Sequence, residues 1–220
     1  MVGVSRSEPR SETVDEWCRA DVATAEGRNA VVAHLEERGG GLDVLVNNAG
    51  RGLQAPWTGM TEDDLRTVLE LNFFAPVLLT QVLYPFLRSS QGSVINVSSV
   101  AGKAGIPFMG GYCASKFALT AFSESLRGEA DADGVRVLNL TVGRIATGFG
   151  TNVLGDWRAP STHGVASAER LARIAVRAWR HRRRDVVFPA WYRPAIWLAK
   201  LFPVRFGRLA RKKWEGSNLA

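Results

Sequence analysis

A tyrosine and a lysine stand four residues apart in the segment Tyr112-Cys113-Ala114-Ser115-Lys116. On a helix, residues at this spacing project from the same face, so the phenol and the ammonium would lie close together. An unperturbed phenol has a pKa near ~10, and a neighbouring positive charge lowers that pKa by favouring the phenolate. The pair is therefore a candidate proton-transfer site, although the same spacing also arises by chance on helix surfaces.

Further polar side chains follow short apolar runs, where buried strands would end. Ser99 follows the run 93–97 and precedes Tyr112 by 13 residues, and residues 47–50 follow the run 42–46. Residues 143–147 likewise follow the run 135–142. In a doubly wound sheet, the carboxyl ends of the strands form the ligand crevice, so we expect these groups along one rim.

The apolar spacing predicts the elements that must position these side chains. Strands are expected over 2–5, 42–46, 93–97 and 135–142, and helices over 29–37, 61–87, 112–129 and from about 168. Thr61 has Asp64 three residues later, which is typical of a helix cap. Because nearly all-apolar strands alternate with helices, we expect an α/β fold with a Rossmann-type doubly wound parallel sheet in three α/β/α layers.

Taken together, these motifs resemble the short-chain dehydrogenase/reductase family. The segment 112–116 is similar to the family's Tyr-x-x-x-Lys motif, 98–102 to its catalytic-serine turn, and Asn47-Asn48-Ala49-Gly50 to its NNAG signature. Asn72 falls where the family has a helical catalytic asparagine, and Asp21-Val22 resembles its adenine-contacting pair. Residues 142–147 resemble Pro-Gly-x-Ile-x-Thr, with Val142 in place of proline. The matches run from about residue 2 to residue 147 in the family's order.

The resemblance implies hydride transfer between a nicotinamide coenzyme and an apolar alcohol/carbonyl substrate, with no metal. Tyr112 would be the acid and base, and Lys116 would lower its pKa and hydrogen-bond the nicotinamide ribose. Ser99 would hold the substrate oxygen and stabilise its developing charge. Asn72 would anchor a water through which protons reach Lys116.

The resemblance also implies a set of coenzyme contacts. They are Arg6, Asp21, Val22, Asn48, Ala49, Gly50, Tyr112, Lys116, Ile145 and Thr147. Arg6 stands at the end of the strand that meets the adenosine ribose, where an arginine accommodates a 2′-phosphate. We therefore expect NADP(H) rather than NAD(H); the alternative is an arginine in an exposed turn.

The family's glycine-rich turn, T-G-x-x-x-G-x-G, does not occur in the sequence. By the family's layout, roughly 30 residues would precede residue 1, comprising a central strand, the pyrophosphate loop and a helix. We therefore expect an N-terminally truncated fold with unpaired strand edges and uncovered apolar surface. Either the start is assigned too late, or the protein is a shortened relative that has lost coenzyme binding; we favour the former, because an intact catalytic set has no use without coenzyme.

Charge divides the chain into an acidic body and a basic end. Residues 1–169 hold 14 Lys/Arg and 19 Asp/Glu, whereas residues 170–213 hold 14 Lys/Arg and one acid, Asp185. Four of the seven tryptophans fall in 170–214. We divide the chain into a Rossmann-like domain, 1–190, and a basic, aromatic tail, 191–220. Bulky apolar residues mixed with cations suit an anionic membrane surface, and an ordinary C-terminal helix or subunit contact fits equally well.

Composition argues against several other classes of protein. Cys18 and Cys113 form neither a disulfide framework nor a zinc motif. No run reaches ~18 unbroken apolar residues, and no nucleic-acid recognition module accompanies the basic charge. We expect a homo-oligomer in the reducing cytoplasm, peripheral on the membrane. The second hypothesis is a non-catalytic Rossmann-like interaction or membrane-surface module.

Overall fold

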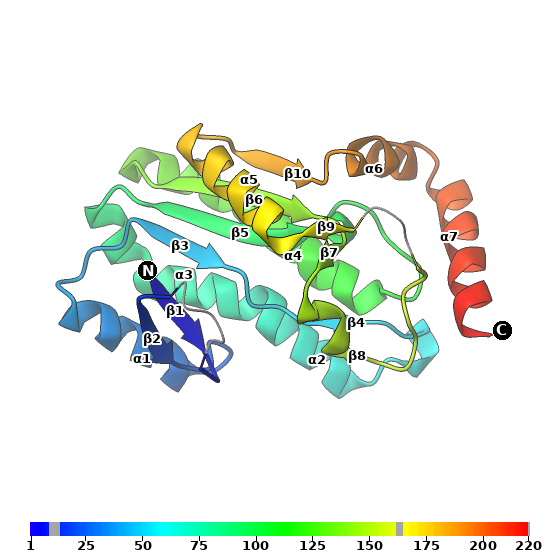
Figure 1. Cartoon of the computed structure of the whole chain (residues 1–220), viewed down its shortest axis with the longest axis horizontal. Coiled ribbons are helices and arrows are strands. Elements are labelled where there is room, and N and C mark those ends of the chain that lie inside the picture. The colour runs from blue at the N-terminus through cyan, green and yellow to red at the C-terminus, as the bar shows by residue number, and fades with distance from the viewer. Residues whose placement is uncertain (9–13, 162–164, 220) are drawn as a thin grey trace.

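The computed structural model describes residues 1–220 except 9–13, 162–164 and 220. Its centre is a four-stranded parallel sheet in the order β10-β6-β5-β3 (Figure 1). These strands are β3 (Val44–Asn47), β5 (Ser93–Ser99), β6 (Arg136–Val142) and β10 (Asp185–Phe188). Ser99 pairs with Val142 in the register, so β5 and β6 end level with each other. The polar segments that follow both strands therefore begin at the same rim.

Helices cover both faces of this sheet, as the sequence predicts. On one face, Val94 and Val137 pack in a cluster with Leu83 of α3 (Ala75–Ser89); α1 (Ala25–Glu37) and α4 (Gly110–Ala130) also contribute to it. On the other face, Ile95 and Leu138 pack against α5 (Ala168–Arg180). Successive strand residues point to opposite faces, and so both faces carry apolar side chains. The three-layer α/β/α Rossmann-type fold is confirmed.

The helical stretch expected over 61–87 is interrupted. Thr61 caps its start by accepting a hydrogen bond from the Asp64 amide at 3.1 Å, as predicted. The stretch then divides into α2 (Glu62–Leu69), a π-turn (Glu70–Phe74) and α3. Such wide turns occur often at functional sites, and this one holds Asn72. The sequence does not reveal the interruption because the backbone partner of Asn72 lies elsewhere in the chain.

Within the described residues, Glu62–Ser89 is the one helical stretch long and apolar enough to cross a membrane. Its apolar composition has another explanation in this fold. Leu79, Leu83 and Leu87 are buried in the sheet's core cluster. We therefore treat the stretch as a core helix.

Two further strands form a sheet of their own. β1 (Val2–Ser5), which the sequence predicts, pairs in parallel with β2 (Glu16–Arg19), which it does not. Among the described strands, neither β1 nor β2 pairs with β3. A cavity of about 1310 Å³ is lined by both β1 and β3, and Val46 of β3 is 52% exposed. Unpaired edges and uncovered apolar side chains thus lie here; that a further strand belongs between them stays a prediction.

The remaining elements are short or C-terminal. Two-residue strands pair as β4 (Gly52–Leu53) with β8 (Val153–Leu154), and β7 (Ile145–Ala146) with β9 (Ala166–Ser167). The tail forms α6 (Tyr192–Leu201) and α7 (Pro203–Asn218), at the end of the molecule to which the sheet strands point (Figure 1).

Candidate active site

Helix α4 positions Tyr112 and Lys116 in its first two turns, and both side chains are buried. The helix approaches its neighbours closely there, since a Cβ on Gly111 would lie 2.7 Å from side-chain atoms of Leu53 and Leu65. Glycine at this position therefore permits the packing that buries the tyrosine.

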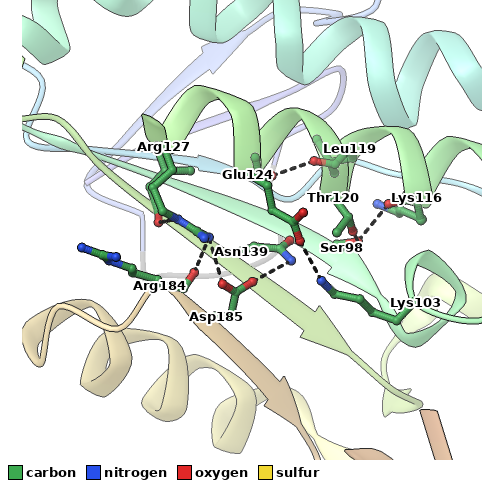
Figure 2. A network of polar contacts seen from close by, with 12 residues as sticks. Ser98, Lys103, Lys116, Leu119, Thr120, Glu124, Arg127, Asn139, Arg184 and Asp185 are labelled. Carbon is green, nitrogen blue, oxygen red and sulfur yellow. Dashed lines mark hydrogen bonds and ion pairs between the residues drawn. The ribbon is translucent and has the colours of Figure 1, made fainter. Parts of the chain in front are cut away.

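Polar contacts hold both ends of helix α4 against the sheet (Figure 2). Ser98 Oγ donates to the Lys116 carbonyl at 3.2 Å and lies 2.8 Å from Thr120 Oγ1. At the other end of the helix, Arg127 forms an ion pair with Asp185 of β10 at 3.0 Å. Because both ends are held by strands, the position of the Tyr112 side chain is set by the sheet.

Ser99 ends β5 beside Tyr112. Its hydroxyl accepts a hydrogen bond from the Ala101 amide at 3.1 Å, which fixes the turn after the strand. The Ser99 hydroxyl also lies close enough to the phenol to lower the pKa of Tyr112. Ser99 and Tyr112, both predicted as catalytic residues, therefore lie near each other.

Asn72 is fully buried, and its amide holds the backbone after the NNAG segment. Its Oδ1 accepts from the Arg51 amide at 2.8 Å, and its Nδ2 donates to the Arg51 carbonyl at 2.9 Å and to Ser115 Oγ at 3.0 Å. This is a two-point clamp on one residue of the loop. Anchoring of a water by Asn72 stays a prediction.

Lys116 lies next to this clamp. Its Nζ donates to the Val97 carbonyl at 3.0 Å. A Cβ added to Gly50 would lie 3.1 Å from Asn72 Oδ1 and 3.4 Å from Lys116 Nζ. Glycine at position 50 thus lets the NNAG segment come close to both Asn72 and Lys116. Gly50 also lines the cavity between β1 and β3, so these two polar side chains lie near that cavity.

Burial controls the protonation of both motif residues. It raises the pKa of Tyr112 to about 12, an effect that the Ser99 side chain opposes, and it lowers the pKa of Lys116 to about 8. Lowering of the Tyr112 pKa by the Lys116 ammonium stays a prediction.

The predicted coenzyme residues divide into two groups. Six of them line the cavity between β1 and β3: Arg6, Asp21, Val22, Asn48, Ala49 and Gly50. Arg6 follows β1 directly, and its Nη1 lies 3.9 Å from Asp21 Oδ2. Ile145 and Thr147 do not line this cavity.

Ile145 and Thr147 follow β6, on the side of Tyr112. Thr147 Oγ1 accepts from the Phe149 amide at 3.3 Å, and the Phe149 ring centre is 6.1 Å from that of Tyr112. The aromatic Phe149 was not among the predicted site residues. Nothing in the local sequence identifies it, because its proximity to Tyr112 is a contact between distant segments.

Two aromatic residues of the tail also reach this region. A Cβ on Gly143 would lie 2.1 Å from the Tyr192 ring of α6, so only glycine accommodates that ring after β6. Trp214 of α7 is buried, 5.9 Å from Phe108, which stacks on Trp157 at 4.0 Å. The tail helices therefore pack on segments that flank α4.

Comparison with known proteins gives a consistent result. The family model described as short chain dehydrogenase matches residues 7–156. The chain is 33% identical over 188 residues to "Dehydrogenase/reductase SDR family protein 7-like" of Anopheles gambiae, covering 81% of this chain and 59% of that protein. It is 30% identical over 231 residues to "Dehydrogenase/reductase SDR family member 7B" of Mus musculus, covering 99% and 70%. The chain thus spans only part of the length of these relatives.

Solved structures share the fold. A short-chain dehydrogenase from Streptomyces avermitilis superposes with a TM-score of 0.76 at 27% identity, covering 98% of this chain and 86% of that one. Another from Burkholderia cenocepacia, in complex with NADP, gives 0.75 at 21% identity, covering 91% and 79%. At the latter identity the likeness shows the fold alone.

Proposed function

We infer, because this chain belongs to the short-chain dehydrogenase family, that it is an oxidoreductase acting on an alcohol/carbonyl pair with a nicotinamide coenzyme. The burial of Ser99 and Tyr112 next to each other, together with Lys116 and Asn72, carries the proposal. It joins a proton-transfer group to an oxygen-binding group at the end of a sheet. The non-catalytic alternative has no comparable observation in its favour.

In this proposal Tyr112 exchanges a proton with the substrate oxygen, and Ser99 holds that oxygen. With a pKa of about 12, the phenol is protonated at neutral pH, and the coenzyme-free protein is therefore prepared to donate a proton rather than to accept one. That state suits carbonyl reduction. Phe149, close to Tyr112, makes one wall apolar and supports an apolar substrate.

The residues present fit a dinucleotide, which would supply the hydride when bound. Asn48, Ala49 and Gly50 would hold its nicotinamide half, and Asp21 with Val22 its adenine. The cavity that these residues line, and the close approach that Gly50 permits, support this assignment.

Arg6 supports NADP(H) over NAD(H). It is exposed and lines the same cavity, and its ion pair with Asp21 is long at 3.9 Å, beyond hydrogen-bond distance, which leaves guanidinium donors for a phosphate.

The proposed coenzyme site also requires a further strand that joins β1 and β3 into one sheet. We expect the cavity between β1 and β3 to take a further parallel strand, whose following loop would cradle the pyrophosphate. The unpaired edges of β1 and β3 and the exposed Val4 and Val46 support this.

We place the protein in a reducing cytoplasm, at an anionic surface. Both Cys18 and Cys113 are buried free thiols. The basic end of the chain, opposed to an acidic body, supports attraction to anionic lipid.

The test compares two tyrosine variants, both made in a protein that carries the expected strand and glycine-rich turn before residue 1 and binds NADPH. Tyr112→Phe removes the proton donor and should lower kcat for NADPH-dependent reduction of apolar aldehydes and ketones by ~10²-fold or more. NADPH affinity, measured by calorimetry, should stay near that of the wild type. Tyr84→Phe is the matched control, since the Tyr84 hydroxyl bonds Asp133 and lies outside the proposed site. Activity retained by Tyr112→Phe would rule out the assigned mechanism.

A further inference from the structure

Large apolar side chains are exposed together where α6 meets α7. We define the α6–α7 corner by five residues that are 49 to 65% exposed: Trp197, Leu198, Leu201, Phe202 and Val204. Residues 197, 198 and 201 share a helix face, and the chain turns directly after them. Soluble proteins seldom expose so many contiguous large apolar residues without a partner.

Cations surround this corner and are not neutralised. Arg193, Lys200, Arg205 and Arg208 are all exposed and, among the described residues, form no ion pair with an acid. The sequence contains no Asp or Glu between Asp185 and Glu215. Arg205 lies 5.9 Å over the Phe202 ring, and so apolar and cationic groups are interleaved. An interfacial segment has this composition: apolar residues that insert, and long cationic side chains that reach head groups.

We propose that the α6–α7 corner binds the surface of an anionic lipid bilayer and holds the active site beside it. A second copy of this chain is a poorer occupant, because a two-fold contact would place two unneutralised cationic rims against each other. Nucleic acid would leave the apolar residues uncovered.

The corner is connected to the site through packing. Tyr192 at the start of α6 lies against Gly143 after β6, and Trp214 of α7 lies against Phe108, four residues before Tyr112. Asn218 holds the same region by accepting from the Arg158 amide at 2.7 Å. If the proposed function is right, on which this step rests, apolar substrates reach Tyr112 from the lipid side.

Vesicle sedimentation tests the corner without reference to catalysis. At low salt, the 220-residue protein should sediment with vesicles of phosphatidylcholine and phosphatidylglycerol, much less with phosphatidylcholine alone, and less as salt is raised. The double variant Trp197→Glu/Leu201→Glu should weaken this binding roughly tenfold or more. Trp57→Glu, at an exposed tryptophan outside the tail, is the matched control and should bind as the wild type does.

Other outcomes would overturn the proposal. Equal binding of the corner variant and the wild type would remove the corner from the lipid contact. Absence of vesicle binding by the folded wild type, with a dimer that the corner variant converts to monomers in gel filtration, would make the corner a subunit contact. Tyr112→Phe separates the two proposals, with activity measured in the protein extended before residue 1 by the expected strand and glycine-rich turn. Tyr112→Phe should lose activity and keep vesicle binding, whereas the corner variant should keep activity on a soluble substrate.

Discussion

At the scale of single residues, burial rather than mutual charge governs the Tyr112–Lys116 pair. The sequence motif suggests that the ammonium activates the phenol. In the structure, burial moves the two pKa values in opposite directions, to about 12 for Tyr112 and about 8 for Lys116, and thus favours the neutral form of each. Ser99 opposes the rise for Tyr112, and a further lowering of the phenol pKa by Lys116 stays a prediction.

Lys116 should make stability depend on pH. Its ordinary pKa is 10.5, and burial lowers it to about 8, so between these values the unfolded chain binds a proton that the folded chain does not. The free energy of unfolding should therefore rise with pH across this window, by about 3 kcal/mol in total. Below pH ~8, Lys116 is protonated while buried in the folded chain, which lowers the free energy of unfolding. Its ionisation therefore adds no stability at these pH values.

The contribution of Lys116 to the pH dependence of stability can be measured by comparing urea unfolding of Lys116→Met with that of the wild type. The variant should lack the rise between pH ~8 and ~10. Above pH ~10, both proteins should lose stability, because the folded state keeps the Tyr112 proton until about 12 while the unfolded chain releases it. Parallel stability curves for the two proteins below pH ~10 would show that Lys116 is not perturbed by burial.

At the scale of elements, the π-turn between α2 and α3 is the feature that aligns the site. It directs Asn72 at the backbone of Arg51, and this clamp holds the NNAG segment against Lys116. A regular helix would require no such partner. The turn is therefore stabilised by a tertiary contact rather than by the helical sequence around it.

Asn72→Ala should accordingly cost stability as well as activity. It leaves the half-buried Arg51 amide and carbonyl without side-chain partners, at up to about 1–3 kcal/mol for each group. The midpoint of urea unfolding should fall clearly, together with kcat. Asn29→Ala, at an exposed position in α1, is the control and should shift the midpoint little. If Asn72→Ala were as stable as the wild type, the π-turn would not depend on the contact between Asn72 and Arg51.

At the scale of the whole molecule, local pattern predicts the core and misses the contacts between distant segments. Buried strands such as β5 and β6 are visible as apolar runs, and the motif residues are found through their resemblance to the family. Strand β10 is not visible, since it follows Arg182–Arg184 and its apolar stretch is only three residues long. The contacts of Tyr192 with Gly143 and of Trp214 with Phe108 join residues far apart in sequence, and no local signal encodes them.

The separation of β1–β2 from the main sheet yields the last prediction. Two parallel strand edges face a cavity of about 1310 Å³ and leave Val4 and Val46 exposed, so residues 1–220 by themselves should be of low stability and bind NADPH weakly. Fusing the first strand, glycine-rich turn and helix of a family member before residue 1 should raise the melting temperature and restore NADPH binding, because the new strand would pair with both edges. A Gly/Ser extension of equal length is the control and should do neither. A cooperative, monomeric melt of residues 1–220 with micromolar NADPH binding would show instead that the cavity serves the coenzyme without a further strand.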